Sequence, residues 1–118
     1  MNIINIADYP GINPAAIEAV NRLNKNLIYV KSKVFTCKVA IEHDVLLAQR
    51  ALIEAGEVLL TNQKEILFLM REGYGDLAGT FNAITLQYKG MHAQMLDILD
   101  RAVSLAIQTQ AQQVYACH

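Results

Sequence analysis

The amino-acid sequence predicts an all-α protein, an antiparallel bundle of three long heptad-patterned helices that self-association could complete. Three segments carry apolar residues in alternating steps of three and four, which is the spacing of one helix face. None of them shows the alternation by two that a strand would need. The 118 residues, 53% hydrophobic and 18% charged, suffice for one domain with its own core and argue against intrinsic disorder.

The first element is a lead-in over residues 1–13, which precedes a single helical domain over 14–118. Asp8-Tyr9-Pro10-Gly11 has the residue types of a turn. Asn13 can cap a helix, and Pro14 is well tolerated at the first helical position. We expect this helix over about 14–42, with an apolar seam formed by Val20, Leu23, Leu27, Val30, Val34, Cys37 and Ile41.

The second helix is expected over about 45–72. Its seam comprises Val45, Ala48, Leu52, Ala55, Leu59, Asn62, Ile66 and Leu69. The first two seams fall out of phase at Glu42-His43-Asp44, which favours a turn there. The alternative is one helix over 14–72, about 88 Å long, which nothing else in the chain could cover. The turn has to form without glycine or proline.

The third helix is expected over about 76–112. Gly73-Tyr74-Gly75 is the strongest internal break, and Asp76 can cap the helix that follows. Its apolar seam is formed by Leu77, Phe81, Ile84, Tyr88, Met91, Met95, Ile98, Ala102 and Leu105.

Charge is balanced overall but unevenly spread. The formal net charge of −1 argues against a protein held to nucleic acid by bulk charge. Residues 22–38 contain five bases and no acid, whereas residues 42–76 contain seven acids and three bases. We interpret this as a basic first helix lying antiparallel to an acidic second helix. A weak nucleic-acid contact through the basic helix is the less favoured interpretation.

The histidines provide no signature of a metal or haem site. His43 stands between two acids, and His92 lies near Met91 and Met95, residue types that can serve as axial haem ligands. Neither histidine has a second ligand at the spacing of helical metal motifs. We therefore expect no metal and no cofactor.

The cysteines provide no catalytic site either. Cys37 falls on an apolar seam, where a thiol is buried and inert. Cys117 and His118 could form a nucleophilic pair, but they lack a third orienting group and a rigid support. We expect no catalytic residues. Two cysteines, no membrane-spanning stretch and no basic n-region at the start favour a cytoplasmic protein.

The chain has more apolar surface than three helices can bury. A second apolar stripe follows the seam of the third helix, and residues 66–70 are apolar all round. The expected partner-binding residues are Ile66, Leu67, Phe68, Met70, Leu96, Leu99, Val103 and Ala106. We expect a non-enzymatic adaptor, chaperone-like or assembly subunit with a protein partner or a homo-oligomeric state. The alternative is a bundle that binds a small hydrophobic ligand or cofactor near Met91, His92 and Met95. The lead-in, which is rich in isoleucine, could cover one stripe but hardly both.

Overall fold

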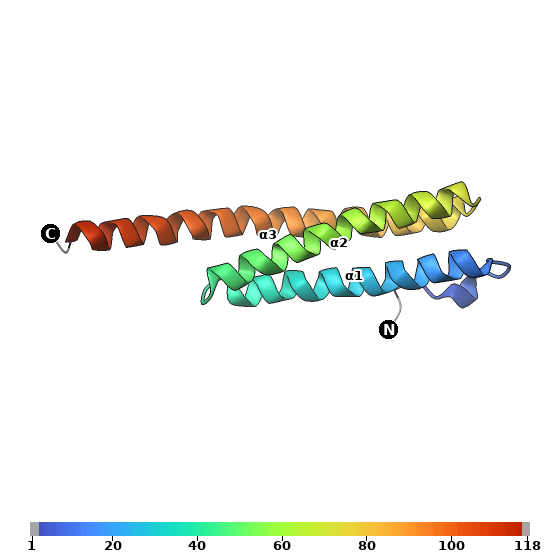
Figure 1. Ribbon diagram of the computed structural model, residues 1–118, viewed down its shortest axis with the longest axis horizontal. Helices are drawn as coiled ribbons and strands as arrows, with labels where there is room; N and C mark the ends of the chain where they lie inside the picture. The colour runs from blue at the N-terminus through green and yellow to red at the C-terminus, as the bar shows by residue number, and fades with distance from the viewer. Residues whose placement is uncertain (1–2, 117–118) are drawn as a thin grey trace.

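The protein is a bundle of three antiparallel helices, as predicted, and its shape is that of an elongated rod. The computed structural model describes the backbone of residues 3–116 and the side chains of residues 3–112. A short 3-10 helix, η1 (Ile6–Asp8), precedes α1 (Pro14–Ala40), α2 (Val45–Arg71) and α3 (Gly75–Ala116), and the described residues contain no strand. The molecule measures 72 × 23 × 17 Å (Figure 1).

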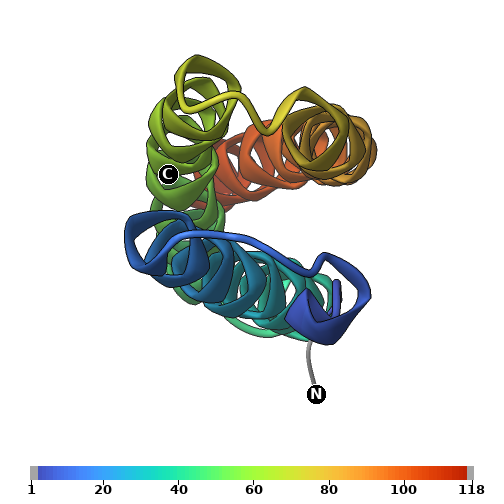
Figure 2. The same ribbon diagram turned by 90° about the vertical axis from the view of Figure 1, so that its right-hand side faces the viewer.

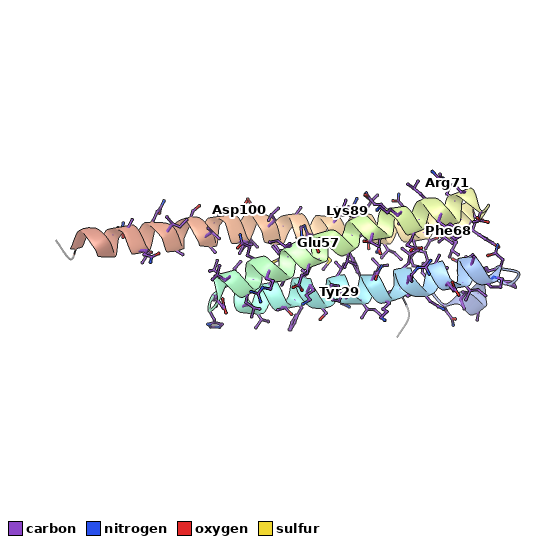
Figure 3. The ribbon with its side chains drawn as sticks, viewed as in Figure 1. Tyr29, Glu57, Phe68, Arg71, Lys89 and Asp100 are labelled. Atoms are coloured by element: carbon purple, nitrogen blue, oxygen red, sulfur yellow. The ribbon has the colours of Figure 1, made fainter. Side chains whose placement is uncertain are left out.

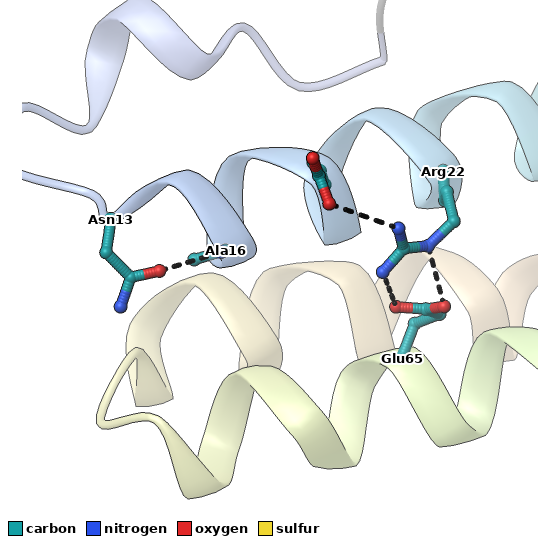
Figure 4. Close-up of polar contacts among 5 residues, drawn as sticks. Asn13, Ala16, Arg22 and Glu65 are labelled. Carbon is teal, nitrogen blue, oxygen red and sulfur yellow. Dashed lines mark hydrogen bonds and ion pairs between the residues drawn. The ribbon is translucent and has the colours of Figure 1, made fainter.

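The sequence signals at the start of α1 act as predicted. The side chain of Asn13 accepts a hydrogen bond of 2.8 Å from the backbone N–H of Ala16, while Pro14 occupies the first helical position (Figure 4). Asparagine in this place satisfies a donor that the helix itself cannot pair.

The chain reverses between α1 and α2, so the single helix over 14–72 is wrong. The carbonyl of Ala40 accepts hydrogen bonds from the N–H groups of His43 and Asp44, at 2.9 and 2.7 Å. The carboxylate of Asp44 then accepts from the N–H of Leu47 at 3.1 Å and so caps α2. This cap marks the start of α2 at a turn that contains neither glycine nor proline.

The α2–α3 turn is a Schellman motif. Gly73 adopts a φ of +90°, a conformation that side chains with a Cβ rarely accept. The N–H of Tyr74 donates to the carbonyl of Leu69 at 3.0 Å, and the N–H of Gly73 donates to that of Met70 at 3.2 Å. Asp76 lies in the first turn of α3, inside the helix that begins at Gly75.

The core is made of two apolar clusters along the rod. The predicted seams of α1 and α2 are buried, except that Val45 and Ile41 at the turn are half-buried. Asn62 and Thr85 are also fully buried but belong to neither cluster. Asn62 accepts a hydrogen bond of 3.0 Å from the side chain of Asn26, while its own amide nitrogen and the hydroxyl of Thr85 have no partner.

The lead-in covers one end of the core. Ile4 is buried in the same cluster as the first half of α1, and Ile3, Ile6 and Ile12 pack against that cluster. The backbone N–H of Asn13 also donates to the Tyr74 hydroxyl at 3.0 Å, which joins the lead-in to the α2–α3 turn. Figure 2 shows this segment beside α1, away from α2. One apolar side of the bundle is therefore closed by the chain itself.

The predicted seam of α3 is wrong in part, because the helix is rotated from the expected position. Met91, Ile98 and Leu105 are exposed. The inward positions are Phe81, Thr85, Tyr88, His92, Met95 and Leu99, which also alternate in steps of four and three. Phe81, Tyr88 and Met95 among them were predicted, whereas Thr85, His92 and Leu99 were not. Two members of this inward seam, Thr85 and His92, are polar. The predicted seam contains no such residue, and its periodicity therefore indicated a side of α3 that is only partly the core side.

The third helix extends beyond its expected range of about 76–112. It has 42 residues, whereas α1 and α2 have 27 each. Its last part extends past the α1–α2 turn (Figure 1), and residues 104–112 are all exposed. No glycine or proline follows Gly90 to end the helix sooner.

Candidate interaction surface

The eight predicted partner-binding residues do not share one surface. Ile66 and Leu99 are core residues with only 8% and 2% exposure. Phe68 and Val103 are half-buried, and Leu67, Met70, Leu96 and Ala106 are exposed. Leu99 was expected in an uncovered stripe, and this is wrong. The residue is buried in a cluster with residues of α1 and α2. A charged substitution at Leu99 would disrupt the core.

The largest ordered set of exposed apolar side chains lies on α2. Leu46, Ile53, Leu60 and Leu67 follow one another at intervals of seven residues, and each is about half exposed or more. Side chains seven apart lie on nearly the same side of a helix. Leu86 and Leu96 on α3 are exposed as well. We call the surface formed by these six residues the outer face.

Three hollows follow the outer face, and α1 contributes to none of them. One, of about 260 Å³, is lined by residues that include Ile53, His92 and Leu96. Leu46 and Ile53 border a second hollow on α2. Leu67 and Gly79 border the third, of about 300 Å³, near the α2–α3 turn. A surface hollowed between two parallel ridges suits the side chains of another helix.

His92 fixes how α2 and α3 align. Its Nε2 lies 2.8 Å from the carbonyl oxygen of Leu52, to which it donates, and the ring lies over Gly56. A Cβ on Gly56 would come within 3.3 Å of that ring, so glycine is what permits the approach. Because α2 and α3 run in opposite directions, residues that lie beyond this contact on α2 face residues that precede it on α3. Leu60 and Leu86 therefore lie at the same height along the rod, that is, level with each other.

Ion pairs fix the other interface, between α1 and α2. Arg22 donates to both carboxylate oxygens of Glu65, at 2.8 and 3.0 Å, and also lies near Glu18 (Figure 4). Lys33 lies 2.6 Å from Glu54. The hydrogen bond from Lys33 lowers the pKa of Glu54, and the hydrogen bond to Glu65 raises the pKa of Arg22. The basic first helix thus faces acids of α2, as predicted.

Charged side chains border the outer face. Figure 3 shows Arg71, Lys89 and Asp100 along the edge of the molecule away from α1. Asp100 is level with Leu46 and so marks the end of the apolar row nearest the α1–α2 turn. Among the ion pairs of the described residues, none joins α2 to α3.

The residues considered for chemistry do not converge. Met95 is buried, whereas Met91 is at the surface, and His92 is bound to the Leu52 carbonyl. Cys37 is buried and unpaired, and its burial raises the pKa of the thiol. No group of three metal-binding side chains occurs among residues 3–112. The suggested pair of Cys117 and His118 lies outside the described residues.

Comparisons with known proteins do not identify the chain. No protein-family model, no curated protein and no solved structure matches it. Within the described part of the chain, each helix is too short or too polar to cross a membrane. The geometry of the outer face is therefore the main guide to function.

Proposed function

We propose that the protein is a non-enzymatic helical interaction module, an adaptor, chaperone-like or assembly subunit, whose outer face docks against helices of a protein partner. The row of Leu46, Ile53, Leu60 and Leu67 carries this proposal. Exposed apolar side chains in such an ordered row are unfavourable in water and often mark a contact with protein. A row at seven-residue intervals beside a second helix suits helix-in-groove packing.

The other interpretations have less support. Arg22 and Lys33 of the basic helix are paired with Glu65 and Glu54, so they are poorly placed to bind phosphates. A ligand held near Met91, His92 and Met95 would have to compete with the bond from His92 to Leu52. The unpaired thiol of Cys37 fits the reducing compartment that a cytoplasmic location would provide.

A pair of matched substitutions tests the proposal. Leu60 on the outer face and Phe35 on α1 are 64% and 65% exposed, so glutamate should cost the fold little at either place. The wild type and the Leu60→Glu and Phe35→Glu variants would each be immobilised and incubated with lysate of the source cells. Bound protein would be quantified per mole of bait, and self-association measured by sedimentation.

We expect all three proteins to be equally helical by circular dichroism. The wild type and Phe35→Glu should bind a stoichiometric protein partner, either another chain or a second copy, and Leu60→Glu should not. The proposal is wrong if the wild type binds no protein, or if Leu60→Glu binds as well as Phe35→Glu.

A further inference from the structure

The two helices of the outer face are unlike each other. The α2 side is a row of large side chains, whereas the α3 side has small residues around Leu86. These are Gly79, Ala83, Gly90 and Ala93, all exposed, and with Leu86 they alternate in steps of four and three. A Cβ added at Gly79 or Gly90 would meet nothing within 4 Å. Glycine weakens an exposed helix relative to alanine, and packing within the chain gives no reason for it at these two positions.

The large and small residues match in height. Leu67 and Gly79 border the same hollow, so they are level. The same alignment, fixed by His92 and Leu52, puts Ile53 near the height of Ala93, although the hollow that Ile53 and His92 border is lined by Leu96 and not by Ala93. Ile53 and Leu67, on either side of Leu60, thus each have a small residue of α3 near their own height, whereas Leu46 is level with Asp100. Small residues allow the backbone of a second helix to approach closely.

The charges match in the same way. Arg50 is level with Asp97, Glu57 with Lys89, and Arg71 with Asp76, so that each pair combines opposite signs. Within one chain these pairs form no ion pair, and Asp97 is instead bound by Arg101 of its own helix. Charges that match in height across two helix faces favour one partner and one register.

We propose that the outer face binds a second copy of this chain about a two-fold axis parallel to the helices. This inference rests on the proposed function of that face. Such an axis keeps every residue at its own height and lays α2 of one copy antiparallel on α3 of the other. Ile53 and Leu67 then meet small residues of α3, Leu60 meets Leu86, and Arg50 meets Asp97 of the second copy, twice in each dimer. A surface that is complementary to itself in this way forms a closed dimer.

The area is sufficient for a stable dimer. Two adjacent helices about 40 Å long and about 10 Å wide each present on the order of 800 Å² per copy, which is the usual size of a specific interface. The result is a four-helix bundle, in which α2 and α3 of one copy pack on α3 and α2 of the other, with the two α1 helices on its outside.

Two charge reversals test this pairing specifically. In Arg50→Glu, residue 50 repels Asp97 of the second copy, and in Asp97→Lys, residue 97 repels Arg50. Mixed together, the two variants can form a heterodimer in which both contacts are attractive again. Both positions are exposed, so each variant should be as helical as the wild type. Sedimentation equilibrium over a range of concentrations measures the dimer dissociation constant.

We expect the wild type to be a dimer. The dimer dissociation constant of each variant alone should be larger by on the order of tenfold, because two attractive pairs become repulsive. The equimolar mixture should return close to the wild-type dissociation constant. A mixture no tighter than its components overturns the pairing of α2 with α3. If the wild type is monomeric but still binds another protein through Leu60, the dimer is wrong and the proposed function of the outer face stands. If the wild type binds neither a second copy nor another protein, both the dimer and the proposed function are wrong.

Discussion

The side chain of Asn24 binds both backbone groups of Ile4. Its Oδ1 accepts from the Ile4 N–H at 2.9 Å, and its Nδ2 donates to the Ile4 carbonyl at 2.8 Å. This pair, buried at the end of the core, imitates one step of a β-ladder and holds the lead-in beside α1. It accounts for the covering of one apolar side of the bundle by the lead-in.

Asn24→Ala should therefore destabilise the protein by about 2–4 kcal/mol, since two buried backbone groups would lose their partners. Urea unfolding followed by circular dichroism measures this change. Asn21→Ala on the same helix is the control, because Asn21 is exposed and should cost little. Equal stabilities of the two variants would show that the lead-in does not depend on this clamp.

Thr85 offers the opposite case. Its hydroxyl is buried without a hydrogen-bond partner, which is unfavourable in an apolar interior. Thr85→Val keeps the shape and removes this group, so the free energy of unfolding should rise by about 1 kcal/mol. Thermal unfolding provides the measurement. A loss of stability would instead mean that the hydroxyl is paired, for example with the free amide of Asn62 through water.

Gly90→Ala links the fold to association. Nothing within one chain lies near the added Cβ, and alanine favours a helix more than glycine does. The free energy of unfolding of the monomer should therefore rise by about 0.5–1 kcal/mol. The same methyl group would stand in the way of the second copy, so the dimer should dissociate more readily. Gln94→Ala, which also replaces an exposed residue of α3, is the control for helix propensity alone. Tighter dimerisation of Gly90→Ala than of the control would contradict the proposed close approach.

Much of the fold could be predicted from local patterns. The seams of α1 and α2 are almost wholly apolar, so their periodicity located the core sides correctly. Asn13-Pro14 and the Gly73 turn act through their own backbone geometry and need no tertiary information. The reversal at Glu42–Asp44 followed from a change of phase, although the cap by Asp44 was not foreseen.

The rest depends on contacts between distant residues. The inward seam of α3 contains Thr85 and His92, and only their burial against α2 identifies them as inward. The clamp between Asn24 and Ile4 leaves no periodic signal. The outer row is spaced by seven, and the positions three or four residues after its first three members are Gln49, Arg50, Gly56, Glu57, Gln63 and Lys64, so it does not resemble a seam. That spacing was the one signal in the sequence that could have revealed it.

The exposed methionines allow the outer face to be tested without substitutions. Met70 borders the outer-face hollow next to Leu67 and is 55% exposed in the single chain, whereas Met91 is 39% exposed and shares a side of α3 with Ile98. Dilute peroxide oxidises exposed thioethers faster than covered ones. In a single chain Met70 should therefore react before Met91.

The most direct measurement is the order in which these two methionines are oxidised in the wild-type protein, at a concentration where it is assembled, followed by peptide mass spectrometry. If the outer face is covered by its partner, Met91 reacts first, and dilution or the Leu60→Glu substitution reverses the order. If Met70 reacts first at every concentration in the assembled protein, the outer face is open, and the docking surface proposed for it is contradicted.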